Sequence, residues 1–401
     1  MKKLKLLFFP TIMALAFGLM LSCAKSSSDD SKSEDTDTST SSAVTVSGKV
    51  QKGPYVQGTE ITVRELDSSM TPTGNTFTGS IDDNTGSFSI KGTLTNKIVE
   101  LAADGFYFNE VSGSLSSAKL SLQAFSDLTD SSSVNVNLMT HLEKKRVEYL
   151  IDSGLTFAAA KTQAQTEIMK IFNIDNVTLG NSETLDISKS GDGNAVLLAI
   201  SAILQSDKTE AQLTELLSTI NTDIRTDGTL DSTTTKATLV TAMEYLKSRR
   251  STIRSNIESR YSSLGISATI PAFESYAFKL DTTAPTVEST SPSNSATGVS
   301  TGVYVLVTFS EEMDNTTITT NTSDTSCSSG TFQISANNFD DCQKFASVAG
   351  EVEISNSSKT FKALTTGAGL ANSTTYKFRI TSGATDVAGN SVSMTAISFT
   401  K

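Results

Sequence analysis

The fold of the C-terminal part is decided by the stretch "DTTAPTVESTSPSNSATGVSTGVYVLVTFSEEMD", residues 281–314. Turn residues dominate its first half, with Pro285, Pro292 and Gly298 among serines and threonines. An apolar run at residues 303–309 follows, and it leads directly into the polar turn "FSEEMD". This order of turn, buried strand and turn predicts a β domain that begins at Asp281.

The rest of the chain after this stretch continues in the same way. A strand containing Tyr376 is followed by the polar turn "DVAGN" at residues 386–390 and by a last strand at residues 394–400. With the Asp-x-x-x-Pro segment and "FSEEMD", these features resemble the bacterial Ig-like domain of the SbsA type. The resemblance covers residues 281–401 and implies an antiparallel β-sandwich with Greek-key connections. Such modules mostly act as spacers or adhesive units, although a fold alone does not fix a function.

Upstream, residues 137–264 have the periodicity of helices. Thr156 is placed to cap an amphipathic helix in "LTFAAAKTQAQTEIMKIFNI", and "DGNAVLLAISAIL" is apolar nearly all round, which predicts the central helix. "EAQLTELLSTI" predicts a third helix, and the longest helix is expected from Thr234 to Ser262. We therefore expect a helical bundle over residues 137–270, which resembles a region of bacterial lipoproteins of unassigned activity.

Residues 43–136 are expected to form a β-sandwich. "VTVSGKV" and "TEITVREL" alternate with the period of half-buried strands, and "DDNTGSFSI" places a turn before another strand. The run at residues 48–90 resembles the carboxypeptidase regulatory-like, transthyretin-like modules of exported bacterial proteins. The predicted fold class is thus multidomain α+β, with an N-terminal β-sandwich, a central helical bundle and a C-terminal Ig-like antiparallel β-sandwich.

The N-terminus has the parts of a secretory signal. Three lysines precede an apolar stretch at residues 6–21, which is short for a spanning helix, and Ser22-Cys23 follows. "MLSC" resembles the lipobox of bacterial lipoproteins, although Met20 stands where that family prefers Leu. The resemblance implies a signal peptide at residues 1–22 and lipidation of Cys23, with palmitate among the acyl chains. Ala24 instead of Asp favours the outer membrane; a retained transmembrane anchor is the alternative.

A polar tether is expected after this cysteine, over residues 23–42. It is nearly all Ser, Thr, Asp, Glu and Lys, so it has no apolar surface to bury and is expected to be disordered. About 20 residues of flexible chain reach roughly 25 Å. The tether would hold the folded part away from the bilayer.

The cysteine count agrees with export. The chain has three cysteines, and lipidation of Cys23 leaves Cys327 and Cys342 as an even pair. If bridged, they close a loop of about 16 residues, which is worth roughly 3 kcal/mol in the chain-entropy model. The insert "CSSGTFQISANNFDDC" also resembles a variant of the Ig-like module with a paired-cysteine loop. Two free buried thiols are the alternative.

Composition excludes some functions. The formal net charge is −11, and about −14 without the signal lysines, which disfavours nucleic acid and anionic membrane surfaces as partners. The single histidine, His141, makes a histidine-rich metal site impossible. No activated-nucleophile motif accompanies it, so we interpret it as a surface or capping residue. The sequence therefore predicts no catalytic residues.

We expect no metal and no cofactor. Residues 186–197 have EF-hand-like steps, but Leu197 stands where the loop requires a bidentate Glu. Asp192 and Asn194 are interpreted as helix caps, with calcium as the alternative there. Calcium is also the alternative at Asp386 and Asn390, which we interpret as a polar turn.

Two further surfaces were candidates for ligand binding. "GFYFNE" holds the one dense aromatic cluster, at residues 106–108, and we interpret it as core. The basic cluster formed by Lys247, Arg249, Arg250 and Arg254 is interpreted as a solvated helix face, with docking of an acidic partner as the alternative.

Two function classes follow. The first is a non-enzymatic, lipid-anchored cell-envelope protein that presents its modules for binding, adhesion or spacing, with an unknown protein or polysaccharide ligand. The second is an envelope hydrolase or other enzyme with an unrecognised site in the helical region. A pocket with convergent acids, or one that contains His141, would favour the second.

Overall fold

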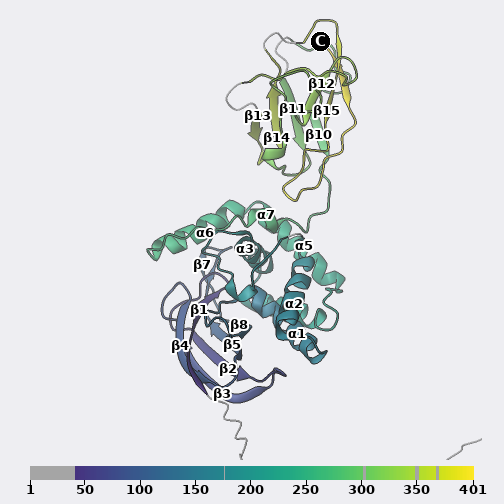
Figure 1. The fold of residues 1–401 in the computed structure, drawn as a ribbon. Coiled ribbons are helices and arrows are strands. Elements are labelled where there is room, and N and C mark those ends of the chain that lie inside the picture. Colours follow the sequence, from purple (N-terminus) through teal and green to yellow (C-terminus); the bar gives the residue numbers. More distant parts are fainter. Residues whose placement is uncertain (1–40, 176, 301–303, 348–351, 367–369) are drawn as a thin grey trace, which may run out of the picture. The chain divides into compact units, whose positions relative to one another are not determined.

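The computed structural model describes residues 41–401 except 176, 301–303, 348–351 and 367–369. The predicted signal peptide, Cys23 and nearly all of the tether lie outside the described residues. Within the described part the chain has the predicted multidomain α+β organisation (Figure 1). No helix of this part is long and apolar enough to cross a bilayer.

The first β part consists of two facing sheets with the strand orders β4-β1-β9 and β3-β2-β5-β8, and a short β6-β7 ribbon. Its strands are β1 (Ser42–Gln51), β2 (Glu60–Leu66), β3 (Pro72–Ser80), β4 (Ser87–Leu94), β5 (Ile98–Gly105), β6 (Phe108–Asn109), β7 (Ser114–Leu115), β8 (Leu120–Asp127) and β9 (Val136–Asn137). Alternate residues such as Ile61 and Val63 are buried, as the period-2 pattern predicted. The predicted turn lies between β3 and β4. There Gly86 has a φ of +83°, and a Cβ would lie 2.3 Å from the Val50 carbonyl oxygen, so only glycine fits.

The helices follow directly, because Asn137 both ends β9 and caps the first helix through Thr140. They are α1 (Leu138–Asp152), α2 (Phe157–Ile171), α3 (Asp192–Gln205), α4 (Glu210–Asp223), α5 (Thr233–Lys247), α6 (Arg250–Ser263) and the short α7 (Glu274–Ala277), with a 3₁₀ turn at Ser182–Thr184. The predicted cap Thr156 accepts a hydrogen bond from the Ala159 amide. The helix α3 is buried from Ala195 to Gln205, so it is the central helix that the sequence predicted.

Two local predictions in this region were wrong. The expected helix from Thr234 to Ser262 is divided into α5 and α6 by a turn at residues 248–249. The division is set by tertiary packing: α5 packs on α3, whereas Asn256 of α6 donates to the Glu110 carbonyl of the β part. No residue at the turn forbids a helix, so the local pattern could not reveal the break.

Asp192 and Asn194 do not cap α3. Gly191 precedes this helix, and no side chain caps its first turn. Instead, Asn194 accepts a hydrogen bond from the Asp186 amide and donates to the Ser190 carbonyl. Its role is to fix the loop that leads into the helix.

One hydrophobic core runs through the β part and the helices. Buried residues of both regions, from Val46 to Phe278, belong to the same cluster. Tyr107 of the β part donates to Gln205 of α3, and Ser201 of α3 lies 2.8 Å from Glu110. The boundary that the sequence suggests at residue 136 thus marks a change of secondary structure, and the packing continues across it.

The C-terminal β part has a separate core. Its strands are β10 (Val287–Ser291), β11 (Tyr304–Phe309), β12 (Phe332–Ser335), β13 (Val352–Ser355), β14 (Thr360–Leu364), β15 (Thr375–Ile380) and β16 (Ile397–Thr400), with a 3₁₀ turn at Asn315–Thr317. They form two antiparallel sheets, β10-β11-β14-β13 and β12-β15-β16. The two sheets bury aromatic pairs such as Phe309–Phe361 and Phe332–Phe378. In the structure Cys327 and Cys342 form a disulfide beside β12, with Cα atoms 5.2 Å apart.

Candidate functional site

Three carboxylates from distant segments meet at one end of the C-terminal sandwich. Asp281 precedes β10, Glu311 follows β11, and Asp386 follows β15. One oxygen of each lies within 4.8 Å of the others. The segments are held together by backbone contacts, since Met313 pairs with Asp386 and the Ser310 amide donates to the Thr286 carbonyl. We call Asp281, Glu311 and Asp386 the acidic cluster.

Backbone and amide donors fix two members of the acidic cluster. Oδ1 of Asp386 accepts from the amides of Ala388 and Asn390, each at 2.8 Å, and Oδ2 accepts from the Asn390 side chain at 2.9 Å. The same Asn390 side chain also donates to the Asp281 carbonyl at 3.0 Å. Oδ1 of Asp281 accepts from the Thr283 amide at 2.9 Å. The "DVAGN" turn is therefore what positions the acids.

An ammonium group supplies the positive charge. Nζ of Lys247, at the end of α5, lies 2.7 Å from Oδ2 of Asp281, 3.5 Å from Oε2 of Glu311 and 3.0 Å from Glu244. Next to it Arg250 pairs with Glu312. The cluster therefore has its own counter-ion from the same chain.

The comparisons with known proteins bear on this part of the chain. Residues 281–401 match the family model of the bacterial Ig-like domain. This region is an Ig-like domain. No curated protein and no solved structure matches the chain. The C-terminal prediction is confirmed, whereas the lipoprotein and transthyretin-like resemblances stay predictions.

Burial and close contact shift the pKa values of groups in and beside the acidic cluster of the Ig-like domain. Burial, followed by the nearby charge of Asp281, raises the pKa of Glu311 to about 7, against a smaller opposite effect of Lys247. Burial acts in the same direction on Asp281, but hydrogen bonds from Lys247 and Thr283 outweigh it and lower its pKa. The ammonium of Lys247 is partly desolvated, yet its acidic partners raise its pKa. Near neutral pH the cluster thus exchanges one proton, at Glu311.

The donor set was tested for a cation. Carboxylate oxygens suit calcium, which takes six to eight oxygen ligands. Here Asp281 and Glu311 pair with the ammonium of Lys247, and the Asn390 side chain directs its N–H group to Asp386. This arrangement fits a bound ammonium better than a metal ion, and calcium at Asp386 and Asn390 stays the alternative prediction.

The basic residues predicted on the long helix bind partners within the same chain. Lys247 and Arg250 bind acids of the Ig-like domain, as described above. Arg254 binds Glu274 at 2.7 Å and the carbonyls of residues 270 and 271. Arg249 lies over the Tyr245 ring at 4.4 Å. Sequence periodicity identified these residues but not their partners, which lie up to 64 residues away along the chain.

The loop at residues 186–197, where calcium is the alternative, also has its acid paired within the chain. Asp186 accepts hydrogen bonds from Gln51 at 2.8 Å and Ser188 at 2.6 Å, and it pairs with Lys49 at 3.1 Å. Burial opposes ionisation of Asp186, but hydrogen bonds from Ser188 and Gln51 lower its pKa to about 2. Leu197, at the position of the missing ligand, is buried in the core. This loop therefore joins the helices to β1.

His141 lies in the first turn of α1, where Asn137 is the cap, so the capping interpretation was wrong. Its Nδ1 atom is buried, and Asn221 of α4 donates to its carbonyl at 3.3 Å. Burial, with the charges of Lys144 and Lys145, lowers the pKa of His141 to about 4. The imidazole is therefore neutral at physiological pH.

The aromatic cluster also differs partly from expectation. Tyr107 is fully buried and Phe108 nearly so, as predicted for a core, but Phe106 is 39% exposed. In one continuous strand, Phe106 and Phe108 would lie on the same face. The alternation fails because the strand β5 ends at Gly105, and Phe108 starts a new ribbon.

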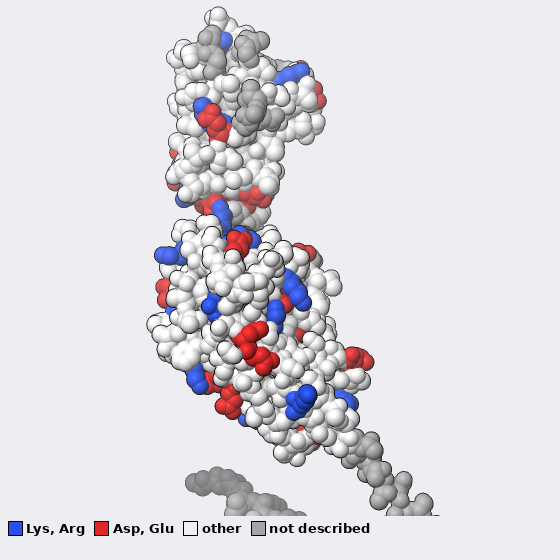
Figure 2. All heavy atoms as spheres, turned by 90° about the vertical axis from the view of Figure 1, so that its left-hand side faces the viewer, with Lys and Arg blue, Asp and Glu red and all other residues white. Residues whose placement is uncertain are grey.

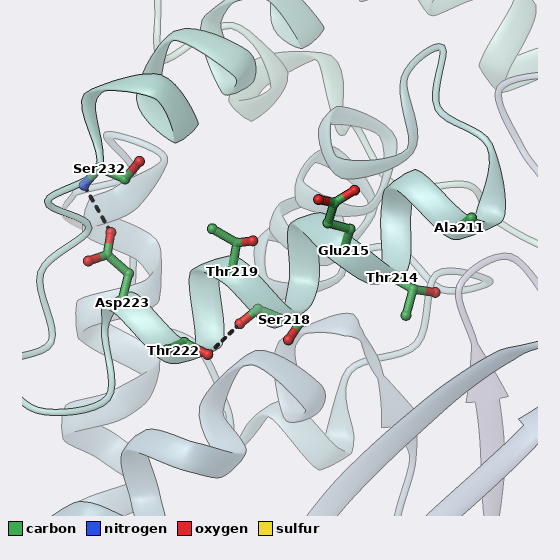
Figure 3. Close-up of a pocket in the computed structure, with 8 residues that line it drawn as sticks. All are labelled: Ala211, Thr214, Glu215, Ser218, Thr219, Thr222, Asp223 and Ser232. Atoms are coloured by element: carbon green, nitrogen blue, oxygen red, sulfur yellow. Dashed lines mark hydrogen bonds between the residues drawn. The ribbon is translucent and has the colours of Figure 1, made fainter.

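A groove of about 780 Å³ runs along α4 (Figure 3). It is lined by Ala211, Thr214, Glu215, Ser218, Thr219, Thr222, Asp223 and Ser232. Asp223 accepts from the Ser232 amide at 2.9 Å, and the Thr222 hydroxyl donates to the Ser218 carbonyl at 2.8 Å. Much of its polar lining thus serves helix ends and helix turns, and His141 is not part of it.

Proposed function

We propose that this chain is a non-enzymatic, lipid-anchored cell-envelope protein that presents its folded modules for binding, adhesion or spacing. The observation that carries the proposal is the match of residues 281–401 to the bacterial Ig-like domain, a surface or adhesion-type module with a core of its own. The signal-like N-terminus and the "MLSC" junction add the anchor at Cys23. Together they support a location of the modules outside the cytoplasm, on a tether.

The proposed location is the cell surface or the outer membrane, with the lipid on Cys23 as the membrane contact. The ligand class is a protein or a polysaccharide. Nucleic acid does not suit the net charge of −11, and Figure 2 shows acidic and basic side chains interspersed over one face rather than a basic patch there.

The chemistry of the described residues supports a role without catalysis. A general base near neutral pH needs an accessible group, but His141 has a buried Nδ1 and a pKa of about 4. Glu311 titrates near neutral pH and lines a hollow of about 830 Å³ that also holds serine and threonine hydroxyls, but the contacts found for it among the described residues are with Lys247 and two carboxylates. The enzyme alternative therefore gains no support from these two residues.

The test is fractionation of cells that produce the full chain. Cys23→Ser is expected to move the protein from the membrane to the soluble fraction, because it removes the lipidated atom. The double variant Cys327→Ser/Cys342→Ser is the matched control, since it removes the other two cysteines and leaves the anchor. Membrane partitioning that is the same in Cys23→Ser and in the parent would refute lipid anchoring. Resistance of the Ig-like domain to protease added to intact cells would contradict display at the surface.

A further inference from the structure

Several charged residues contact one another around residue 281, at the start of the Ig-like domain. We call this group of residues the ring. Lys247 binds Asp281 and Glu311, and Arg250 binds Glu312. Next to them Lys279 donates through Nζ to the Ala388 carbonyl, at 3.1 Å, in the turn that Asp386 organises. These contacts connect α5, α6 and the segment after α7 with two turns of the Ig-like domain.

We propose that the acidic cluster and Lys247 form a proton-operated latch that closes the joint between the helices and the Ig-like domain. The latch is closed when Glu311 carries a proton and loosened when Glu311 is ionised. This inference does not depend on the proposed anchor or on any ligand. In this proposal the "FSEEMD" and "DVAGN" turns control how freely the Ig-like domain moves relative to the rest of the chain.

The charges that face Glu311 explain the direction of the effect. One oxygen each of Asp281 and Asp386 lies within 4.8 Å of one of Glu311, and the Lys247 ammonium lies 2.7 Å from Asp281 and 3.5 Å from Glu311. With Glu311 protonated, the net charge of these four groups is −1. Ionisation of Glu311 changes this net charge to −2, in a partly buried place. Like charges at this separation repel, so the open joint, where water screens them, is favoured.

The outer charges on the neighbouring elements balance one another. Glu244 of α5 lies 3.0 Å from Lys247, and Arg250 of α6 is paired with Glu312. On the other side Lys359, in the turn before β14, donates through Nζ to the Ser310 carbonyl at 2.9 Å. Glu311 is therefore the group of the ring whose pKa lies near neutral pH, at about 7.

The sign of the pH dependence follows from this pKa. In the open joint Glu311 has its ordinary pKa of 4.5, and in the closed joint the pKa is raised to about 7. Closure therefore takes up a proton between these values, and the closed form is lost as pH rises through about 7. The two pKa values imply that the open fraction increases about tenfold between about pH 6 and about pH 8.5.

In the full mature chain, the rate of trypsin cleavage reports the fraction of molecules in which the joint is open. Lys279 is half-buried and tied to the Ala388 carbonyl, so cleavage after it requires the joint to open. The rate of cleavage after Lys279, divided by the rate on a free peptide of the same sequence, is expected to rise about tenfold over that pH range. Glu311→Gln, which resembles the protonated acid, is expected to cleave slowly at both pH values.

Matched variants separate the latch from general stability. Glu353→Gln, which alters an exposed acid of the same domain, should keep the full pH dependence. Lys247→Met should cleave fast at both pH values, and it serves as the second variant if Glu311→Gln does not fold. A parent rate that does not change with pH, or an unchanged pH dependence in Glu311→Gln, would overturn the proposal. Protection by millimolar calcium that is lost in Glu311→Gln would also overturn it, because the cluster would then be a metal site.

Discussion

The two largest hydrophobic cores among the described residues treat charge in opposite ways. The core shared by the first β part and the helices encloses ion pairs such as Lys52–Glu110, in which both side chains are 0% exposed. The Ig-like domain keeps an aromatic interior and gathers its acids at one end, where Lys247 and Glu311 remain 17% exposed. In the first arrangement each buried charge depends on its partner, whereas the second can gain or lose a proton.

This difference predicts which mutations destabilise each part. A buried pair adds little net stability over an apolar pair, but removal of one partner leaves a charge that water cannot reach. The first core contains a second example, since Lys161 lies 2.6 Å from Glu143 and 2.9 Å from Glu183. The Ig-like domain instead has a covalent constraint, the Cys327–Cys342 disulfide. Mutations at the two kinds of site are therefore expected to act on different cores.

The largest effect is expected for Lys52→Met. It leaves Glu110 without its cation in a buried place, which costs about 3–5 kcal/mol in comparable pairs. The measurement is urea unfolding followed by the helical far-UV signal, because Ser201 of α3 contacts this pair. Lys119→Met, which removes an exposed ion pair with Asp104 in the same β part, is the matched control and should cost at most about 1 kcal/mol.

The double variant Lys52→Met/Glu110→Leu makes this test sharper. Because both charges are absent, most of the lost stability should return. A double variant as unstable as Lys52→Met would show that shape rather than charge is decisive at this site.

The next effect concerns the other core. Cys327→Ser/Cys342→Ser opens a loop that spans 15 positions, and the chain-entropy model gives a loss of about 3 kcal/mol. Differential scanning calorimetry should show a lower melting temperature for the Ig-like domain and an unchanged transition for the helical core. Mass spectrometry of the non-reduced parent should find one linked peptide pair. Two alkylatable thiols in protein from the envelope would contradict the bridge.

Sequence patterns predicted the elements well and their charged contacts poorly. The three turns that carry Asp281, Glu311 and Asp386 were all recognisable as parts of the Ig-like module, but no pattern shows that they converge. Lys52 and Glu110 are 58 positions apart, and a lysine in a glycine-rich turn is ordinarily solvated. Periodicity reports which face of an element is apolar, whereas the pairing of buried charges depends on how distant elements pack. The same limit explains why the turn between α5 and α6 was missed.

A pH-dependent effect is expected at His141, the only histidine of the chain. Its pKa is about 4 in the folded protein and 6.5 in an unfolded chain, so the unfolded chain binds more protons between these values. Stability of the helical core should fall as pH drops from about 7 to about 4, with about 3 kcal/mol of the loss due to this residue. His141→Gln should lack that part of the pH dependence. Parallel stability curves for parent and variant would show that His141 is ordinarily solvated.

The largest deletion is expected to have the smallest effect on the first core. Residues 281–401 have their own buried cluster, and Ala388 is the one buried residue of the Ig-like domain that the first core includes. Removal of the domain also takes away partners of Lys247 and Arg250, but such partly exposed pairs contribute at most about 1 kcal/mol each. A chain ending at residue 280 should therefore keep its helical signal and lose about 1 kcal/mol of stability.

The isolated fragment 281–401 should melt cooperatively with a β-type far-UV spectrum, because its sheets, aromatic core and disulfide are complete within it. Circular dichroism of both pieces is the measurement. An unfolded fragment, or a remainder that loses its helices, would mean that the two cores depend on each other. The contrast between them would then describe two regions of one cooperative unit.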